Sequence, residues 1–159
     1  MSVDKLSNIR KLRHWHGDLN VEKYIFTVGE AGEAFFNGLK KGKIIASKCS
    51  KCGTMYLPPR GYCEKCFSRI NEFVEIQNKG YIHTYTIQRK DKKGKNLDKP
   101  VAWALIKFPN VEGGLIHRLG EINLEDLEIG LEVEPVFKPE KERQGHIGDI
   151  LYFKPTEKG

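Results

Sequence analysis

The 159-residue chain contains no long hydrophobic run. No stretch approaches the roughly 18 uninterrupted apolar residues that a membrane-spanning helix requires, and the N-terminus has no apolar segment of the secretory type. No asparagine is followed two positions later by serine or threonine, so the sequence offers no glycosylation acceptor. We therefore expect a soluble, cytoplasmic protein that does not enter a membrane.

Familiar catalytic motifs are missing as well. The sequence has no Gly-x-Ser-x-Gly elbow, no P-loop and no His-Glu-x-x-His motif. His83, His117 and His146 are scattered, and we interpret each of them as structural or exposed rather than catalytic. These absences favour a binding or accessory protein over an enzyme.

Cysteine is confined to one central strip, where it forms two CxxC pairs with ten residues between them. The four cysteines are Cys49, Cys52, Cys63 and Cys66. Because each pair can aim two thiolates at one ion, the spacing predicts the tetrahedral site of a zinc ribbon. Four sulfur ligands leave no position for water or substrate, so the predicted metal is structural.

The residues that follow the two cysteine pairs differ. Gly53 follows the first pair, where glycine adopts the left-handed conformation that commonly ends such a turn. Phe67 follows the second pair, and we expect the absence of glycine there to affect the geometry of the ribbon.

Other uses of the four cysteines are less favoured. A redox CxxC motif needs no second pair, and disulfides are disfavoured in a chain without a secretory signal. Plain buried cysteines would not explain the paired spacing. Iron in a rubredoxin-like site uses the same four thiolates, so iron stays an alternative to zinc.

Positive charge is concentrated in one segment of the chain. The formal net charge is +6, and a divalent ion held by four thiolates would reduce it to about +4. Residues 89–99 contain six basic and two acidic side chains. A basic loop of this kind can bind an anionic ligand, although most such loops are simply solvated.

Helical periodicity is limited to the N-terminal third. Residues 4–16 predict a short helix. A second helix is predicted after Thr27, which stands in the capping-box relation to Glu30. Its apolar side chains recur every fourth residue at Ala31, Phe35 and Leu39. Phe35 and Phe36 are interpreted either as core contacts or as a wall for an apolar ligand.

Strand periodicity follows the cysteine strip. Alternation places Tyr81 and Tyr85 on one face of a strand with Ile87, and residues 101–108 are apolar on both faces like a central barrel strand. Three further strands are predicted within residues 115–119, 131–137 and 149–153. Five short strands with the longest break after the third predict a Greek-key barrel of the OB type.

The predicted protein is therefore mainly β with N-terminal helices, a zinc ribbon and a five-stranded OB-fold barrel. We divide it into an N-terminal helical segment at residues 1–42, the ribbon at residues 43–70 and the OB-fold domain at residues 71–159.

The order of these motifs resembles a known family. A helix containing Phe35-Phe36-Asn37-Gly38-Leu39, the two cysteine pairs, the limb Pro58-Pro59-Arg60 between them and a following barrel are similar to the rubredoxin-like zinc ribbon plus OB-fold family once labelled a domain of unknown function. The resemblance runs over most of residues 27–155. It assigns the four cysteines to the metal and identifies Pro58, Pro59 and Arg60 as the family's Pro-Pro-Arg limb.

The resemblance implies a non-catalytic accessory protein that binds acyl-CoA and accompanies a thiolase-fold enzyme. In archaea such a protein is held to link acetoacetyl-CoA thiolase with hydroxymethylglutaryl-CoA synthase in lipid and isoprenoid metabolism. CoA calls for basic groups beside an apolar channel. The candidates for its phosphates are Arg60, Arg89, Lys90, Lys92 and Lys93. The candidates for its pantetheine arm are Phe35, Phe36 and Leu39.

The alternative function is binding of single-stranded nucleic acid. OB barrels bind strands through aromatic side chains in a basic groove, and Tyr81, Tyr85 and Trp103 could stack on bases. Their apolar surroundings in sequence make burial an equally good interpretation, so we rank this function second.

Overall fold

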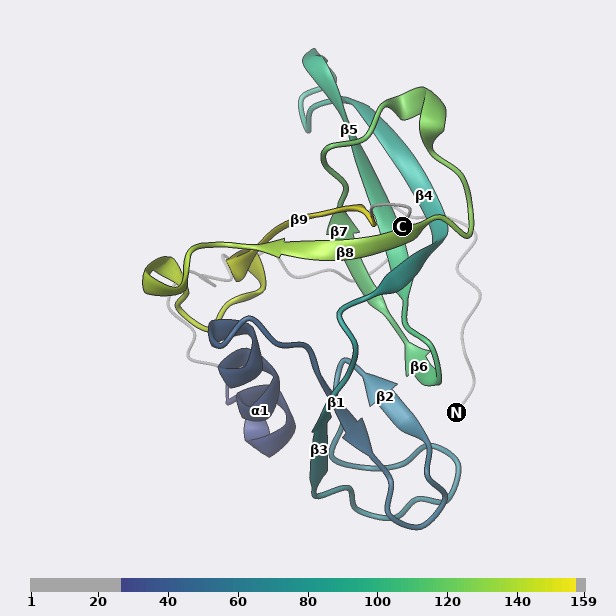
Figure 1. The fold of residues 1–159 in the computed structure, drawn as a ribbon, viewed down its shortest axis with the longest axis vertical. Coiled ribbons are helices and arrows are strands. Elements are labelled where there is room, and N and C mark those ends of the chain that lie inside the picture. The colour runs from purple at the N-terminus through teal and green to yellow at the C-terminus, as the bar shows by residue number, and fades with distance from the viewer. Residues whose placement is uncertain (1–26, 157–159) are drawn as a thin grey trace, which may run out of the picture.

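The structure, a computed structural model, describes residues 27–156. The predicted helix at residues 4–16 lies outside the described residues. Figure 1 shows a small sheet at one end, a β-barrel at the other and the helix α1 (Gly29–Lys40) beside their junction. No helix within residues 27–156 has the length and apolar character needed to cross a lipid bilayer.

Helix α1 begins one residue later than the predicted cap at Thr27 implies. Its N-cap is Val28, which makes no side-chain capping bond, so the predicted capping box of Thr27 and Glu30 is wrong. The physical reason is register, because a capping box needs its acid three residues after the N-cap and Glu30 is only two residues after it. The Glu30 carboxylate instead accepts hydrogen bonds from Arg69, at 3.1 and 3.3 Å.

The small sheet has the strand order β3-β1-β2-β6. Its strands are β1 (Ile45–Lys48), β2 (Met55–Leu57), β3 (Glu72–Glu75) and β6 (Val111–Gly113). β2 ends at the Pro58-Pro59 pair, which lacks the N–H groups that a ladder requires. β6 comes from the barrel and runs parallel to β2, a pairing that the sequence did not predict.

Gly113 permits this close approach of barrel and ribbon. Its φ is +90°, and a Cβ atom there would lie 2.2 Å from the carbonyl oxygen of Leu57. The same carbonyl accepts a hydrogen bond of 2.8 Å from the N–H of Gly114. A larger residue at position 113 would therefore separate the two sheets.

The barrel has the strand order β7-β5-β4-β8-β9. Its strands are β4 (Gly80–Lys90), β5 (Asn96–Lys107), β7 (Leu115–Arg118), β8 (Glu132–Phe137) and β9 (Ile150–Pro155). A parallel bridge from Leu119 to Phe153 joins the two outer strands and closes the barrel. This is the connectivity of an OB fold, so the predicted five-stranded barrel is confirmed.

Short helical turns fill the barrel connections. The turn η2 (Leu124–Asp126) occupies the break after the third barrel strand, and η3 (Glu140–Glu142) and η4 (Ile147–Asp149) lie between β8 and β9. In Figure 1 the η3–η4 connection lies directly above α1.

A β-bulge changes the alternation predicted for β4. The register between β4 and β5 shifts between Ile82 and Thr84. As a result Ile82 pairs with the buried Ile106, and Tyr85 pairs with the buried Ala104. Tyr81 therefore does not share a face with Tyr85, and that prediction is wrong, because an inserted residue inverts every later position of a strand with period two.

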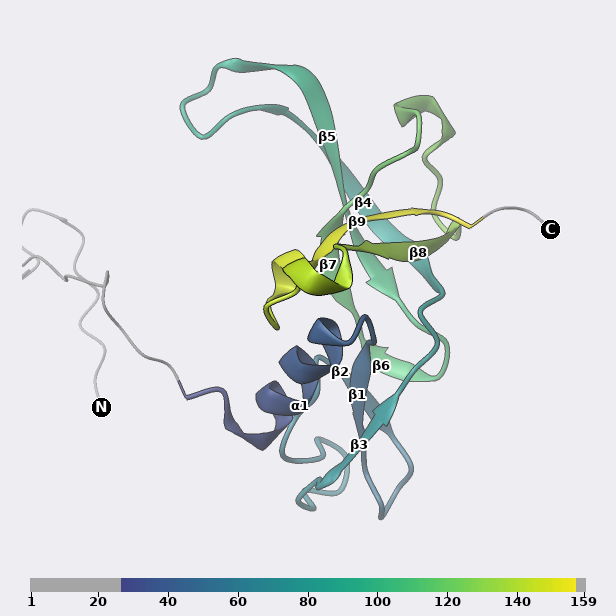
Figure 2. The ribbon, with the colours of Figure 1, turned by 60° about the vertical axis from the view of Figure 1, so that its left-hand side comes forward.

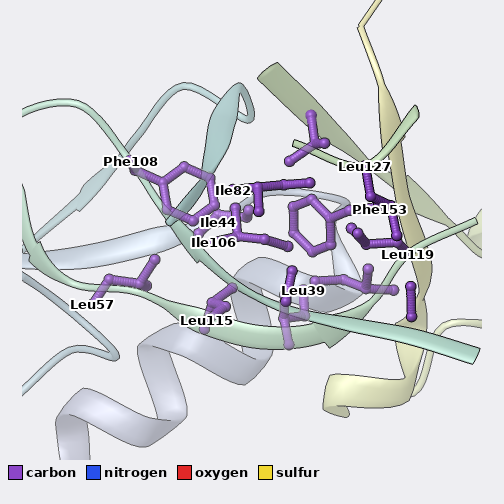
Figure 3. Packing of buried hydrophobic residues seen from close by; sticks show 14 of the residues in the cluster. Leu39, Ile44, Leu57, Ile82, Ile106, Phe108, Leu115, Leu119, Leu127 and Phe153 are labelled. Atoms are coloured by element: carbon purple, nitrogen blue, oxygen red, sulfur yellow. The ribbon is translucent and has the colours of Figure 1, made fainter. Parts of the chain in front are cut away.

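Helix, ribbon and barrel share one hydrophobic core. Figure 3 shows Leu39 of α1 and the ribbon residues Ile44 and Leu57 packed into the same cluster as the barrel residues Ile106 and Phe153. These side chains are fully buried. A second, much smaller cluster surrounds the cysteines and contains Tyr56 and Ile70.

Candidate functional site

The two cysteine pairs sit on turns with the same hydrogen bonds. In the first turn the N–H of Gly53 donates to the carbonyl of Cys49 at 2.8 Å, and in the second the N–H of Phe67 donates to the carbonyl of Cys63 at 3.0 Å. The first cysteine of each pair also forms a backbone hydrogen bond with the residue five positions later. The N–H groups of Cys49 and Cys63 donate to the carbonyls of Thr54 and Ser68, both at 2.9 Å.

Phe67 adopts the conformation that glycine supplies in the first turn. The φ angles are +73° at Gly53 and +56° at Phe67. The expectation that a missing glycine changes the ribbon's geometry is therefore wrong. A left-handed conformation costs a non-glycine residue about 1–2 kcal/mol. The Phe67 side chain is nevertheless 83% exposed, so it gains no burial within residues 27–156 in return.

The four predicted ligands converge on one point. Their Sγ atoms all lie within 4.8 Å of one another, with distances of 3.5 Å for Cys49–Cys66 and for Cys52–Cys63 and 3.9 Å for Cys52–Cys66. Zinc–sulfur bonds of about 2.3 Å in a tetrahedron place the sulfurs roughly 3.8 Å apart. The donor set therefore fits one tetrahedral ion whose positions are all filled by thiolates.

Hydroxyl groups stabilise the thiolate form that binds a metal. The Ser68 hydroxyl lies 3.2 Å from Sγ of Cys49 and 3.0 Å from Sγ of Cys66, and its hydrogen bond lowers the pKa of the Cys49 thiol. The Tyr56 hydroxyl, 3.3 Å from Sγ of Cys63, lowers the pKa of that thiol to about 6. Groups that orient the ligands in this way also tune a metal site.

These supporting hydroxyls were missed from the sequence, although part of the signal is present. Thr54 and Ser68 occupy equivalent positions, two residues after the second cysteine of each pair. The Cys52 thiol donates a hydrogen bond of 3.3 Å to the Thr54 hydroxyl, so Thr54 contacts the sulfur of its own turn as Ser68 does in the second turn. Tyr56 has no such positional signal, because it reaches Cys63 across the fold.

Two family models match the chain. The rubredoxin-like zinc ribbon domain of ChsH2 matches residues 36–72, and the C-terminal OB-fold domain of ChsH2 matches residues 73–138. A DUF35 domain-containing scaffold protein of Methanocaldococcus jannaschii is 38% identical over 120 residues, which cover 72% of this chain and 82% of that protein. The chain belongs to the DUF35 family.

Solved structures of DUF35 proteins have the same fold. A crystal structure of a DUF35 protein of unknown function from Sulfolobus solfataricus has a TM-score of 0.66 and 40% identity, covering 80% of this chain and 87% of that one. The Ltp2-ChsH2(DUF35) aldolase contains a chain with a TM-score of 0.61 and 22% identity, covering 82% of this chain and 98% of that one. The second likeness establishes the fold alone.

The DUF35 helix directs most of its candidate ligand residues inward. Phe35 and Leu39 belong to the shared core, and Phe36 is partly buried against it. Arg60 pairs with Glu64, and its guanidinium carbon lies 5.4 Å from the centre of the Tyr56 ring. Of these residues only Phe36 and Arg60 present part of their side chains to solvent.

The other basic candidates lie elsewhere. Arg89, Lys90, Lys92 and Lys93 are exposed at the free end of the β4–β5 hairpin. Figures 1 and 2 show this end of the hairpin at the opposite end of the molecule from α1. The structure thus does not bring these four residues together with Arg60 or with the phenylalanines of the helix.

A groove of about 400 Å³ separates the start of α1 from the second cysteine turn. Its lining is mostly apolar, with one ion pair: Val28, Gly29, Glu30, Ala31, Gly61, Tyr62, Arg69, Ile70 and Phe73. The sequence did not predict this groove, because three separate segments form it. A larger hollow of about 1200 Å³ beside η2 includes Glu121, Glu125, Asp126 and Glu128, which disfavour an anionic ligand.

Proposed function

We propose that this DUF35 protein is a non-catalytic scaffold that binds a thiolase-fold enzyme and contributes to an acyl-CoA site. The curated relatives are named scaffold proteins, and a ChsH2(DUF35) chain occurs together with Ltp2 in an aldolase. The thiolase class of the partner and the acyl-CoA ligand rest on the family resemblance.

The observation that carries a docking role is the second cysteine turn. Tyr62 and Phe67 flank this turn and are 66% and 83% exposed; we call these two side chains the knuckle patch. A phenylalanine held at positive φ with its ring in solvent costs the free protein stability. Exposed aromatic side chains on a rigid turn are typical anchors of protein interfaces. In this function the metal would stabilise the conformation of the turn, because four cysteine ligands leave no coordination position for a substrate.

The acyl-CoA site that we propose is the groove beside α1. Its volume is within the usual range for ligand sites, its walls are largely apolar, and Arg69 lies at its edge. Arg60 is one residue from the groove-lining Gly61 and can meet a phosphate if its pairing with Glu64 opens. The knuckle patch shares Tyr62 with the groove, so ligand and partner would meet at one surface.

Co-purification tests the scaffold role. A tagged full-length chain expressed in its native host should capture a thiolase-fold enzyme, and we further propose that acetoacetyl-CoA thiolase and hydroxymethylglutaryl-CoA synthase are held in one complex. Phe67→Gly should remove most of the captured enzyme while leaving the unfolding free energy within about 1 kcal/mol, because relief of the left-handed strain offsets the flexibility of glycine.

Ile129→Ser is the matched control, since Ile129 is an exposed apolar side chain on the barrel (69% exposed). Equal capture by the Phe67→Gly variant and the wild type would contradict the docking surface. Capture of enzymes without a thiolase fold would contradict the proposed partner.

Thermal unfolding tests the acyl-CoA site. A ligand at 100 times its Kd adds about 2.7 kcal/mol to the stability of a protein that binds it only when folded. Acetoacetyl-CoA should therefore raise the melting temperature, and Ala31→Phe, which fills the groove, should abolish the shift. Glu33→Phe, at an exposed position of the same helix, should leave the shift unchanged. A shift that survives Ala31→Phe would place the ligand elsewhere.

A further inference from the structure

The β4–β5 hairpin extends from the barrel as a basic arm, which we define as residues 89–99. Its tip is ordered by Asp91, whose carboxylate accepts hydrogen bonds from the N–H groups of Lys93 and Lys95 at 2.8 and 2.9 Å. The N–H of Gly94 donates to the Asp91 carbonyl at 3.0 Å. The carboxylate of Asp91 is thus used by backbone N–H groups of the turn, and the neighbouring Lys92, Lys93 and Lys95 are exposed.

The cations of the basic arm have no carboxylate partners among residues 27–156. The ion pairs found in that part of the chain are Lys43–Glu75, Lys48–Glu72, Arg60–Glu64, Lys65–Glu112, Arg69–Glu30 and Lys154–Glu134. All of them lie outside the arm. The ribbon's basic side chains are therefore largely neutralised in place. In the arm, Lys99 lines the acidic hollow beside η2, whereas the cations nearer the tip are exposed and available to an external anion: Arg89, Lys90, Lys92, Lys93 and Lys95.

A row of flat side chains lies on the outer face of the barrel next to the arm. Trp103 of β5 pairs in register with Arg118 of β7, and the Arg118 guanidinium carbon lies 5.9 Å from the centre of the Tyr152 ring on β9. Trp103 is 37% exposed, and its indole N–H donates to the side-chain oxygen of Gln88 at 3.1 Å. Gln88 directly precedes the arm, so this hydrogen bond fixes the indole at the arm's base.

The arm and the aromatic row occupy the positions that OB folds use for strand binding. OB barrels bind oligonucleotides across their second and third strands, between the connection of strands one and two and the connection of strands four and five. Here those elements are β5 and β7, the basic arm, and the η3–η4 connection. Figure 2 shows the arm bending toward the side on which η3 and η4 lie.

We propose that this face binds single-stranded nucleic acid, with phosphates on the basic arm and a base stacked on Trp103. Single-strand binding proteins combine a basic track with aromatic stacking platforms, and arginine adds a stacking plane. An acidic protein surface would also be attracted by the arm, but the place of Trp103 and Arg118 on the second and third barrel strands, beside the arm, matches the strand-binding face of OB folds and favours a single strand. The inference is independent of the scaffold role, which uses the opposite end of the molecule.

Fluorescence anisotropy of labelled single-stranded DNA and RNA, about 12–16 nucleotides long, tests the proposal on the metal-loaded full-length protein. We expect binding that weakens steeply as salt rises. Lys90→Gln/Lys93→Gln should lower affinity about tenfold at low salt and reduce the slope of log K against log[salt] by roughly 1.4, because each phosphate contact on a single strand contributes about 0.7. Trp103→Ala should weaken binding roughly tenfold with little change in slope.

The matched control is Lys41→Gln/Lys79→Gln, which removes the same charge from exposed lysines near the ribbon and should alter affinity less than twofold. Thermal melting of each variant ensures that the fold is intact. The proposal is overturned if the wild type does not bind either oligonucleotide at low salt, or if the control variant loses as much affinity as the arm variant. It is also overturned if Trp103→Ala binds like the wild type, because the strand would then be held by charge alone and no base would stack on Trp103.

Discussion

At the scale of single residues, Asp149 is the buried charge on which the connection between β8 and β9 depends. Its side chain is 1% exposed. Its carboxylate accepts hydrogen bonds of 2.7–3.1 Å from the N–H groups of Gln144, Gly145 and His146. Burial alone would raise the pKa of Asp149, but these donors outweigh it and the pKa is lowered. The ionised carboxylate therefore stabilises the folded connection.

Replacing Asp149 by asparagine should reduce the free energy of unfolding by about 1.5–3 kcal/mol at neutral pH, the contribution of hydrogen bonds to a charged group. Because the folded pKa lies below the unfolded value of about 3.9, this stabilisation is present above that pH and is lost as pH falls further. Urea unfolding of both proteins from pH 7 to pH 3 should show the difference shrinking below about pH 4. Glu142→Gln, an exposed acid in the same connection, should have little effect, and a pH-independent difference for Asp149→Asn would contradict this account.

At the scale of elements, the metal ribbon depends on its ion. The apolar cluster around the cysteines is small, and structural zinc contributes an apparent ~10–16 kcal/mol in isolated zinc-finger peptides. A chelator should therefore unfold the two cysteine turns, residues 49–54 and 63–68, as measured by faster amide exchange there, while Leu57 of β2 stays in the shared core. Amides of β4 and β5 should stay protected, since the core beneath them, with Ile82 and Ile106, contains no metal ligand. Simultaneous loss of protection in the barrel would show that the ion supports both units.

The elements also show which features can be read from a sequence. The cysteine turns and the strand β5 follow patterns that are local in sequence, so spacing and apolar content predict them. The pairing of β6 with β2 joins residues more than fifty positions apart through strands of three residues, and no periodicity marks it. The bulge after Ile82 and the conformation of Phe67 likewise depend on contacts that form only in the folded chain.

At the scale of the whole molecule, the shared core couples ribbon and barrel. Leu39 is fully buried among side chains of α1, the ribbon and the barrel (Figure 3). Leu39→Ala should cost about 2–5 kcal/mol. Tryptophan fluorescence and release of the metal should report the same unfolding midpoint in the variant, and that midpoint should be lower than in the wild type. Leu124→Ala, at the partly buried edge of the core, should cost less. Two separated midpoints in the wild type would contradict the coupling.

The candidate sites also differ in whether their residues are close together in sequence or are brought together only by folding. The metal ligands are predictable because all four belong to one repeated motif. The groove beside α1 could not be predicted, because Val28, Tyr62 and Phe73 come together only through the fold. Phe35 and Leu39 satisfy the sequence criteria for an apolar ligand wall, but those criteria are the same as for a core helix, and the structure places both in the core.

The backbone pairing of β6 with β2 has a geometric consequence. Because β6 of the barrel is hydrogen-bonded into the ribbon sheet, the ribbon and the barrel cannot rotate freely about the segment that connects them, unlike two domains joined by a flexible linker. The span between Phe67 and the barrel face that carries Trp103 is then set by main-chain pairing and is insensitive to most side-chain replacements. Whatever binds at one end is held at a constant orientation with respect to whatever binds at the other.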